Sequence, residues 1–307
     1  ARGMTYKAAV AGLDLGGGKS VILGDNRTKD REDIFRAHGR AVESLKGRYI
    51  TAEDVGTSVE DMEYVLMETD SVTGLKGASG DPSPVTAFGV YQGIKACARF
   101  LYGDDSLQGK HIVVQGVGHV GYYLCRDLAN DGARLTITDI DEDRIKRVVE
   151  DFGATVVRNE DVYKVDAEVF APCALGAVIN DDTLKVLNVD IVAGAANNQL
   201  SESRHGKMMY DLGIVYAPDY VINAGGLCNV YGELQGWTSD QGKTKAGEIY
   251  DTILGILNQA KAEDKKKFGR GGSGRGGIDL SNDITFGNGE TLSNDTDGDL
   301  LFTTATA

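Results

Sequence analysis

The sequence predicts an α/β protein with a largely parallel sheet, and three observations support that prediction. Short apolar runs alternate with amphipathic helical stretches, which is the pattern of a parallel sheet covered by helices. The length of 307 residues favours about two domains. Pro82 and Pro84 interrupt the chain within Asp81-Pro82-Ser83-Pro84, so we place a domain junction there.

The expected elements follow in order along the first part of the chain. Strands are expected at residues 20–23, 111–115, 135–138, 169–170, 191–193 and 214–216, where short apolar runs are bounded by polar or glycine-rich segments. Helices are expected at residues 30–45, 59–68, 86–101, 119–130, 141–151 and 243–262, where apolar residues recur at helical spacing. A second junction is expected near residues 232–236, before the last helix.

The composition excludes several classes of protein. The chain is 41% hydrophobic and 25% charged, which is ordinary for a soluble globular protein. Its net charge of -14 argues against a nucleic-acid partner, which would favour a basic face. No apolar run approaches the roughly 20 residues needed to cross a membrane. The four cysteines lie far apart without a C-x-x-C pair, so we expect a reduced cytoplasmic protein with no metal site.

The last part of the chain differs in composition. From Lys265 it runs through the Arg/Gly-rich stretch 269–277 into a segment rich in Asn, Asp, Gly and Thr. Its apolar residues are too sparse and aperiodic for a packed face, so residues 264–307 are expected to be a disordered low-complexity tail. An Arg/Gly stretch can bind RNA, but this one is short and flanked by acidic residues, which makes RNA binding the weaker interpretation.

A dinucleotide-binding motif is the strongest local signal. Gly116-Val117-Gly118-His119-Val120-Gly121 directly follows one expected strand and opens the next expected helix, which is the order that a Rossmann fold requires. Gly116 permits the tight turn, Gly118 lets the pyrophosphate approach the backbone, and Gly121 allows the helix to pack closely on the strand. We therefore expect a doubly wound Rossmann-type domain that binds its cofactor at Gly116, Gly118, His119, Val120 and Gly121.

The second half of the motif indicates which cofactor is bound. Asp139 ends the next expected strand and follows Gly116 at about the 20-residue distance that the motif requires. A carboxylate there accepts hydrogen bonds from the adenosine ribose and repels a 2′-phosphate. The nearest following arginine is Arg144, so the sequence favours NAD over NADP.

A lysine follows the glycine run Gly16-Gly17-Gly18, and two kinds of chemistry could use it. A phosphate-binding P-loop needs a glycine five positions before the Gly-Lys pair, and that position holds Leu13, so this interpretation fails. The glycines remove side chains beside Lys19, and a substrate could approach it closely. A lysine that is partly desolvated there, or near another cation, has a lowered pKa and can exchange protons near neutrality.

Two further residues could complete such a site. Lys7 could supply a second positive charge, and Asp54 places a carboxylate at the end of a short strand-like run. Two lysines and an aspartate suit a substrate that bears a carboxylate and an amine. The spacing also allows the plainer interpretation that all three are surface charges, which is the usual place of Lys and Asp.

Several motifs in the same order resemble the Glu/Leu/Phe/Val amino-acid dehydrogenase family, and most of all its leucine dehydrogenases. They are residues 12–19 (GLDLGGGK), 49–57 (YITAEDVGT), 82–87 (PSPVTA), 170–176 (FAPCALG), 195–200 (AANNQL) and 216–226 (YAPDYVINAGG). The resemblance spans roughly residues 1–263. It implies reversible oxidative deamination, in which an L-amino acid and NAD give a 2-oxo acid, ammonium and NADH.

The resemblance also assigns roles that spacing alone leaves open. Lys7 would hold the substrate carboxylate through charge-assisted hydrogen bonds. Lys19 would be the general base that activates water, and Asp54 would shuttle protons to and from the amino group. The residues that it implies near the nicotinamide are Thr86, Asn197, Asn198 and Asn223.

Three positions match the family's substrate pocket, namely Ala52, Leu227 and Val230. Ala52 resembles the leucine enzymes, whereas phenylalanine enzymes often have glycine there, and Leu227 resembles certain phenylalanine enzymes. One methylene in such a pocket shifts preference by only about 1–3 kcal/mol. The motif around Ala52 favours leucine and other branched aliphatic amino acids, with phenylalanine as the alternative.

The chain departs from the family pattern at both ends. Family members begin some tens of residues before the position of Ala1, and the segment after Asp264 does not resemble theirs. We therefore expect an N-terminally truncated catalytic domain at 1–85, an NAD-binding Rossmann domain at 86–232, a hinge helix region at 233–263 and the tail at 264–307. Two hypotheses stay open: an active dehydrogenase that assembles as a homo-oligomer, and a fragment that binds NAD without catalysis.

Overall fold

A six-stranded parallel sheet lies at the centre of the protein. The structure is a computed structural model that describes residues 1–25, 27–76, 81–267, 284–285, 291–294 and 300–303. The strands are β1 (His111–Gln115), β2 (Arg134–Thr138), β3 (Thr155–Val156), β4 (Ala167–Pro172), β5 (Val189–Val192) and β6 (Val215–Tyr216). They run in the order β3-β2-β1-β4-β5-β6 with every pair parallel, which is the order of a doubly wound Rossmann sheet. The predicted α/β class and Rossmann-type topology are therefore confirmed.

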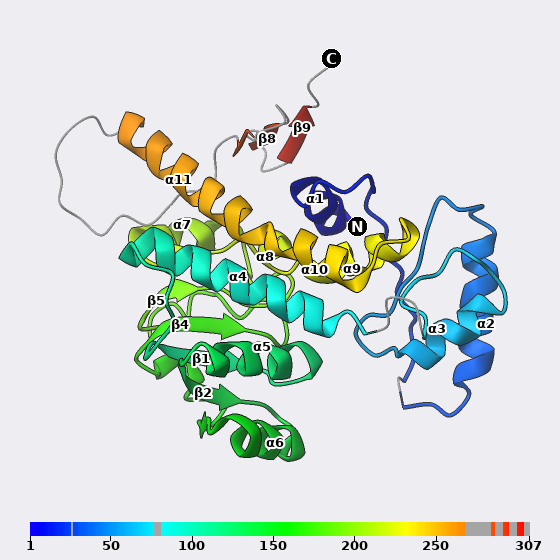
Figure 1. Cartoon of the computed structure of the whole chain (residues 1–307), viewed down its shortest axis with the longest axis horizontal. Helices are drawn as coiled ribbons and strands as arrows, with labels where there is room; N and C mark the ends of the chain where they lie inside the picture. The colour runs from blue at the N-terminus through cyan, green and yellow to red at the C-terminus, as the bar shows by residue number, and fades with distance from the viewer. Residues whose placement is uncertain (26, 77–80, 268–283, 286–290, 295–299, 304–307) are drawn as a thin grey trace.

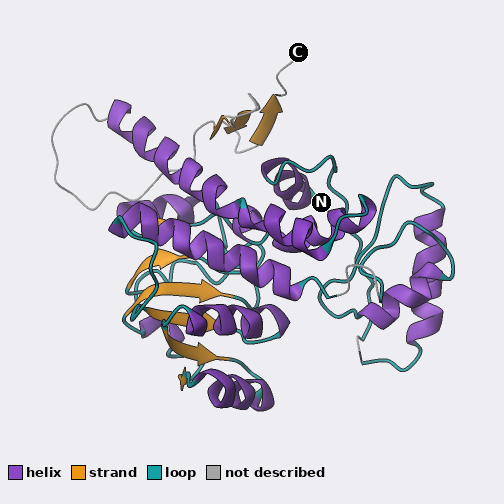
Figure 2. Ribbon diagram, in the orientation of Figure 1, coloured by secondary structure: helices purple, strands orange, loops and turns teal. Residues whose placement is uncertain are grey.

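Helices surround this sheet and extend beyond it (Figure 2). They are α1 (Arg2–Val10), α2 (Arg31–Glu43), α3 (Val59–Leu66), α4 (Ser83–Tyr102), α5 (His119–Asn130), α6 (Glu142–Phe152), α7 (Arg204–Asp211), α8 (Asp219–Ile222), α9 (Gly225–Leu234), α10 (Ser239–Gly247) and α11 (Ile249–Lys267). The helices α4, α5 and α7 contact strands of the sheet, and α11 packs along α4. In Figure 1, α2 and α3 form a separate lobe at the right of the view.

The main core lies between the sheet and α4. Val90 and Ile94 of α4 are fully buried, as is Val114 of β1. The same apolar cluster includes Ile253 of α11. Because burial of this continuous apolar face stabilises one position of α4, it also fixes the first turn of α4 and the loop after β1, and both carry predicted site residues.

The lobe of α2 and α3 has a small core of its own. Phe35 of α2 and Met62 of α3 belong to one buried cluster with Val72. An isolated parallel bridge joins Thr51 to Val72, which ties the segment before Asp54 to this core. The predicted catalytic carboxylate therefore follows a braced segment rather than a free loop.

Residues 20–23 do not form the predicted strand. Val21 and Leu23 are 78% and 94% exposed, and residues 19–23 carry no regular secondary structure. Apolar β-branched residues favour extended backbone, but a strand also needs a neighbour that satisfies its N–H and C=O groups. Within the described part of the chain no other segment pairs with this one, so the prediction is wrong there.

The chain after residue 238 also differs from the predicted pattern. The predicted helix 243–262 is two helices, since α10 begins at Ser239 behind a capping box from Thr238 and is separated from α11 at Glu248. α11 continues to Lys267, and β7 (Ile284–Thr285), β8 (Thr291–Asn294) and β9 (Leu300–Thr303) form a three-stranded antiparallel sheet. These residues differ from the predicted structureless tail, while the Arg/Gly stretch 269–277 lies outside the described residues.

Close packing between α4 and α8 generates a first prediction. A Cβ at Gly93 of α4 would lie 2.4 Å from Cγ1 of Ile222, which is fully buried. We expect Gly93→Ala to lower the free energy of unfolding in urea by about 1–3 kcal/mol, because overpacking outweighs the gain in helix propensity.

The matched control is Gly255→Ala in α11, where a Cβ would meet no atom within 4 Å. That change should raise the free energy of unfolding by about 0.5–1 kcal/mol through helix propensity alone. If both alanines stabilise the protein equally, α4 and α8 do not pack at this distance.

Candidate active site

The glycine motif after β1 forms a cradle that side chains would fill. Gly116 has a φ of 92°, a backbone conformation that strongly favours glycine. A Cβ at Gly121 would lie 2.1 Å from the backbone oxygen of Gly116, so the start of α5 can approach β1 only without a side chain there. Gly118 is the N-cap of α5, and His119 and Val120 form the first turn of that helix. The free N–H groups of this turn suit a phosphate group.

Asp139 at the end of β2 is held rigidly beside this cradle. Its carboxylate accepts hydrogen bonds from the backbone N–H groups of Val117 at 2.7 Å and Ile140 at 2.7 Å. Carboxylate oxygens have further lone pairs for ribose hydroxyls. Arg144 was the nearest arginine in the sequence, and its Nη1 would lie 3.5 Å from a Cβ at Gly118. The arginine therefore lies against the phosphate cradle.

Two loops at the carboxyl edge of the sheet pack tightly on each other. Ala177 and Asn198 have φ values of 60° and 52°, and the N–H of Ala177 donates to the carbonyl oxygen of Asn198 at 2.7 Å. A Cβ at Gly176 would lie 2.5 Å from the carbonyl oxygen of Asn197. Non-glycine residues in this conformation carry strain of order 1 kcal/mol or more, so the surrounding contacts must hold the two loops in place.

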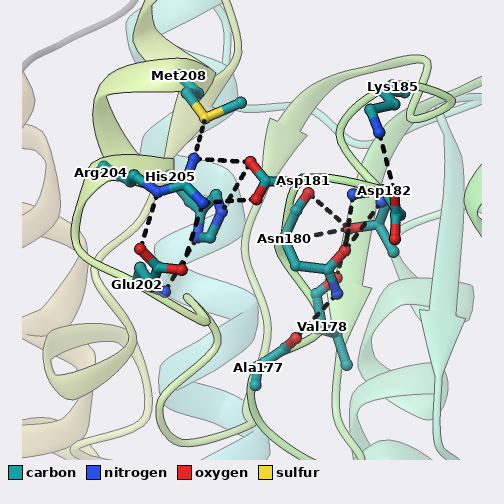
Figure 3. A network of polar contacts seen from close by, with 11 residues as sticks. Ala177, Val178, Asn180, Asp181, Asp182, Lys185, Glu202, Arg204, His205 and Met208 are labelled. Atoms are coloured by element: carbon teal, nitrogen blue, oxygen red, sulfur yellow. Dashed lines mark hydrogen bonds and ion pairs between the residues drawn. The ribbon is translucent and has the colours of Figure 1, made fainter.

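A network of ion pairs and hydrogen bonds connects residues that follow these two loops in the chain (Figure 3). Arg204, at the start of α7, donates to Asp181 at 2.7 Å and to Glu202 at 2.8 Å. His205 is buried, and its Nδ1 accepts from the N–H of Glu202 at 3.0 Å. The network therefore links the segment after Ala177 to the segment after Asn198.

Asn197 connects α1 to the segment that follows β6. Its Oδ1 accepts hydrogen bonds from Nζ of Lys7 at 3.2 Å and from Nδ2 of Asn223 at 2.8 Å. The Oδ1 of Asn223 is buried and has no hydrogen-bond partner among the residues that the structure describes. A buried acceptor without a partner is costly. The free Oδ1 of Asn223 could accept a hydrogen bond from the amide group of a nicotinamide. The phosphate cradle, which is free of side chains, belongs to the same edge of the sheet.

Lys7 is not a surface charge. Only 9% of the residue is exposed, and burial lowers the pKa of its ammonium from 10.5 to about 8. The negative charge of Asp219 opposes this shift, and the positive charge of Lys19 adds to it. The structure thus places the two predicted lysines near enough for their charges to interact.

Lys19 contacts the second predicted catalytic group directly. Its Nζ hydrogen bonds with Oδ2 of Asp54, and both side chains stay partly exposed, at 43% and 45%. Burial lowers the pKa of Lys19. The glycine run is also needed for packing. A Cβ at Gly17 would lie 2.1 Å from Oγ1 of Thr5, and one at Gly18 would lie 2.5 Å from the ring of Tyr49.

The predicted pocket residues come from two separate elements. Leu227 and Val230 lie one turn apart on α9, and Leu227 packs on the cluster that contains Leu13. Ala52 is half-buried, two residues before Asp54. Leu13 belongs to the segment that leads to the glycine run, so α9 and the lysine segment are neighbours.

Thr86 lies in the first turn of α4 and faces α9. Its Oγ1 donates to the carbonyl oxygen of Pro82 at 2.9 Å. A Cβ at Gly226 would lie 2.5 Å from Oγ1 of Thr86. The hydroxyl keeps a free lone pair. Thr86 therefore lies where the first turn of α4 meets the start of α9.

Two acidic residues of the site were missed by the sequence analysis. Glu53 has a buried Oε2 without a hydrogen-bond partner in the described part of the chain, and burial raises the pKa of its carboxyl, with the nearby Asp81 adding to the rise. Asp219 accepts from the N–H of Gln199 at 3.0 Å. Glu53 lies in the motif 49–57 and Asp219 in the motif 216–226. Membership of these motifs was the only feature of the sequence that could have indicated the two residues.

Metal and membrane sites have little support in the described residues. No group of three His, Cys, Asp or Glu side chains there is arranged to hold a metal ion. The four cysteines are free thiols. Among the helices in these residues, none has both the length and the apolar character needed to span a bilayer.

Comparison with known proteins agrees with this geometry. Residues 1–71 match the family model "Glu/Leu/Phe/Val dehydrogenase, dimerisation domain", and residues 135–267 match the model "Glutamate/Leucine/Phenylalanine/Valine dehydrogenase". Leucine dehydrogenase of Bacillus subtilis is 58% identical over 260 residues, which cover 84% of this chain and 71% of that protein. Leucine dehydrogenase of Thermoactinomyces intermedius is 57% identical over 265 residues, or 85% of this chain and 72% of the relative.

A solved structure gives the same result for the fold. The crystal structure of L-tryptophan dehydrogenase from Nostoc punctiforme superposes with a TM-score of 0.72 at 44% identity and covers 86% of this chain and 76% of that one. The predicted resemblance is therefore confirmed over most of the chain. The protein belongs to the Glu/Leu/Phe/Val dehydrogenase family.

Proposed function

We propose that this protein catalyses the NAD-dependent, reversible oxidative deamination of L-leucine and other branched aliphatic L-amino acids. The observation that carries the proposal is the meeting of Lys7, Lys19 and Asp54 with Asn197 and Asn223 of the Rossmann domain. The identity of 58% and 57% with two leucine dehydrogenases supports the same activity here. Such relatives imply a nicotinamide cofactor.

Lys7 is the proposed ligand of the substrate carboxylate. Its ammonium is mostly protonated at neutral pH, below a pKa of about 8, and a carboxylate would pair with it through a short charge-assisted hydrogen bond. Burial strengthens this pairing, because few water molecules compete for the ammonium. The hydrogen bond to Asn197 sets the orientation of the ammonium.

Lys19 and Asp54 are the proposed proton-transfer groups. A bound nicotinamide would supply the hydride acceptor for oxidation of the substrate's neutral amine, at its Cα, to an iminium. Lys19 then takes a proton from the water that attacks the iminium carbon, and the lowered pKa of this lysine makes its neutral form accessible. Asp54, in contact with Lys19, carries protons to and from the leaving amine.

The Rossmann domain is the proposed NAD site. Asp139 would accept the ribose hydroxyls, and its fixed carboxylate would repel a 2′-phosphate. Arg144 lies against the phosphate cradle, where we propose that it attracts the pyrophosphate. The remaining proposed contacts are the first turn of α5 for the phosphates (His119, Val120), Thr86 and Asn198 for the nicotinamide and its ribose, and Asn223 for the amide.

Assembly and domain roles follow the same proposal. Residues 1–85 would form the catalytic domain, residues 86–232 the NAD-binding domain, and residues 233–263 the hinge region between them. The match of residues 1–71 to a dimerisation-domain model supports a homo-oligomer. We propose that it works in the cytoplasm, where NAD is available.

The proposal is tested by following NADH formation with purified protein and a panel of L-amino acids. We expect L-leucine or L-valine to give the highest kcat/KM, because Ala52 narrows the pocket by one methyl group relative to glycine. NAD should be preferred over NADP. If L-phenylalanine leads the panel, Leu227 is the better guide to the pocket; if no amino acid is oxidised while NAD still binds, the protein only binds the cofactor.

Lys19→Ala separates catalysis from cofactor binding. We expect kcat to fall by about 10²–10⁴, the usual contribution of a general base, while the Kd for NADH measured by fluorescence stays within about twofold. Lys29→Ala, at a lysine outside the site, is the control and should change neither value. Equal losses of kcat and NADH binding would mean that Lys19 has a structural role.

The buried charge of Lys7 should lower the free energy of unfolding, and this loss should disappear as the pH rises from about 8 to 10.5. Its pKa is about 8 in the folded protein and 10.5 in the unfolded chain, so the unfolded state binds more protons between these values and stability rises with pH there. We therefore expect Lys7→Met to be more stable than the parent protein at pH 7, by about 3 kcal/mol at most.

The stability gain of Lys7→Met should shrink as the pH rises from 8 to 10.5, because the folded parent no longer holds a buried charge. Urea denaturation at several pH values measures it. Lys146→Met, at a lysine whose side chain is 73% exposed, should show no such pH-dependent difference. A gain that is constant across the window would contradict the lowered pKa.

A further inference from the structure

A cavity of about 350 Å³ lies between α4, α5 and α10, apart from the proposed active site. Its lining residues are Pro84, Val85, Phe88, Tyr91, Arg126, Asp127, Asn130, Asp131 and Lys243. None of them is a proposed catalytic, substrate or cofactor residue. The volume is in the usual range for small-molecule sites, about 300–1,000 Å³.

One side of the cavity is aromatic. The rings of Phe88 and Tyr91 lie one turn apart on α4, with their centroids 6.4 Å apart and their planes tilted by 38°. Both side chains are half-buried, and Pro84 and Val85 extend the apolar surface. Such a wall suits a ring or a bulky aliphatic group, because apolar contact area and ring stacking stabilise the complex.

Two carboxylates that are mostly covered also line the cavity. The side chains of Asp127 and Asp131 are 16% and 25% exposed, and burial raises the pKa of Asp127. Asp131 accepts from the hydroxyl of Tyr91 at 3.1 Å and lies 3.6 Å from Nζ of Lys95. A ligand ammonium would find two negative groups beside the rings.

Two cations complete the lining. Arg126 is paired with the adjacent Asp127 at 2.9 Å. Lys243 of α10 lies 4.9 Å from the ring centroid of Phe88, and its ammonium has no ion pair or hydrogen bond within the described residues. Lys243 is therefore a cation at the rim of an aromatic cavity that can accept an anionic partner.

We propose that this cavity binds a zwitterionic amino acid with an aromatic or bulky aliphatic side chain. The ligand carboxylate pairs with Lys243 and Arg126, its ammonium pairs with Asp127 and Asp131, and its side chain lies on the rings of α4. The charged side chains that line the cavity are two cations and two carboxylates, and Lys95, outside the lining, also pairs with Asp131. A zwitterion therefore meets a complementary charge at each end, whereas a nucleoside phosphate would bring its negative charge against two carboxylates.

The experiment measures binding, so its result does not depend on turnover. L-Phenylalanine is titrated by calorimetry into the Lys7→Met protein, in which the proposed carboxylate ligand of the active site is absent. We expect one mole of L-phenylalanine bound per mole of chain, with a Kd below about 1 mM. Adding Lys243→Met should raise that Kd by at least tenfold, the effect of losing about 1.4 kcal/mol.

Two further variants keep the test decisive if Lys243→Met alters the protein in other ways. Asn130→Trp fills the cavity from an exposed position of α5 without removing a charge, and it should also abolish binding. Lys261→Met removes a lysine that lies 5.0 Å from the ring of Phe100, a matched cation–ring contact outside the cavity, and it should leave the Kd unchanged.

Three outcomes would overturn the proposal. The first is that L-phenylalanine does not bind to the Lys7→Met protein. The second is binding that Lys243→Met and Asn130→Trp leave unaffected, which would place the ligand elsewhere. The third is binding of adenosine monophosphate in the same cavity with a lower Kd than L-phenylalanine, which would identify a nucleotide site.

Discussion

The arrangement of the proposed active site depends on one hydrogen bond between α1 and a loop at the carboxyl edge of the sheet, from Nζ of the buried Lys7 to Oδ1 of Asn197. A buried ammonium without an acceptor would be strongly unfavourable, so α1 can lie against the Rossmann domain only where Asn197 receives it. Asn223 donates to the same oxygen atom and fixes the amide. The position of Lys7 therefore depends on a loop that follows it by 190 residues.

That loop is itself held under strain. Asn198 and Ala177 both have positive φ values, and the ion pairs of Arg204 with Asp181 and Glu202 hold the two segments together. Exposed ion pairs contribute little individually, but here they act on loops that are already joined by a backbone hydrogen bond. A loop that presents an amide to a lysine, and by our proposal also to a cofactor, has few conformations available, and strain at such sites is common.

The sequence predicted local features well and long-range features poorly. β1 and α5 lie where apolar pattern and the glycine motif placed them, because strand, tight turn and helix are specified within about 20 consecutive residues. Residues 20–23 have the same local pattern, yet no described segment pairs with them. The surroundings of Lys7 could not be predicted either, since its hydrogen-bond partner Asn197 and the nearby charge of Asp219 lie far along the chain. Glu53 was missed because the surroundings of its carboxyl include residues far along the chain, such as His119.

Lys7 is buried and Lys19 is partly exposed. This difference suits the two proposed tasks, which are carboxylate binding by Lys7 and proton transfer by Lys19. Lys7 is almost fully enclosed and keeps an amide as its hydrogen-bond partner, so it can exchange Asn197 for a carboxylate without meeting bulk water. Lys19 is 43% exposed and contacts Asp54, so it has both a proton acceptor and access to solvent. A group that holds a charge benefits from a dry site, whereas a group that exchanges protons needs a path to water. The glycine run makes the second environment possible, because side chains at Gly17 or Gly18 would push Lys19 away from α1 and Asp54.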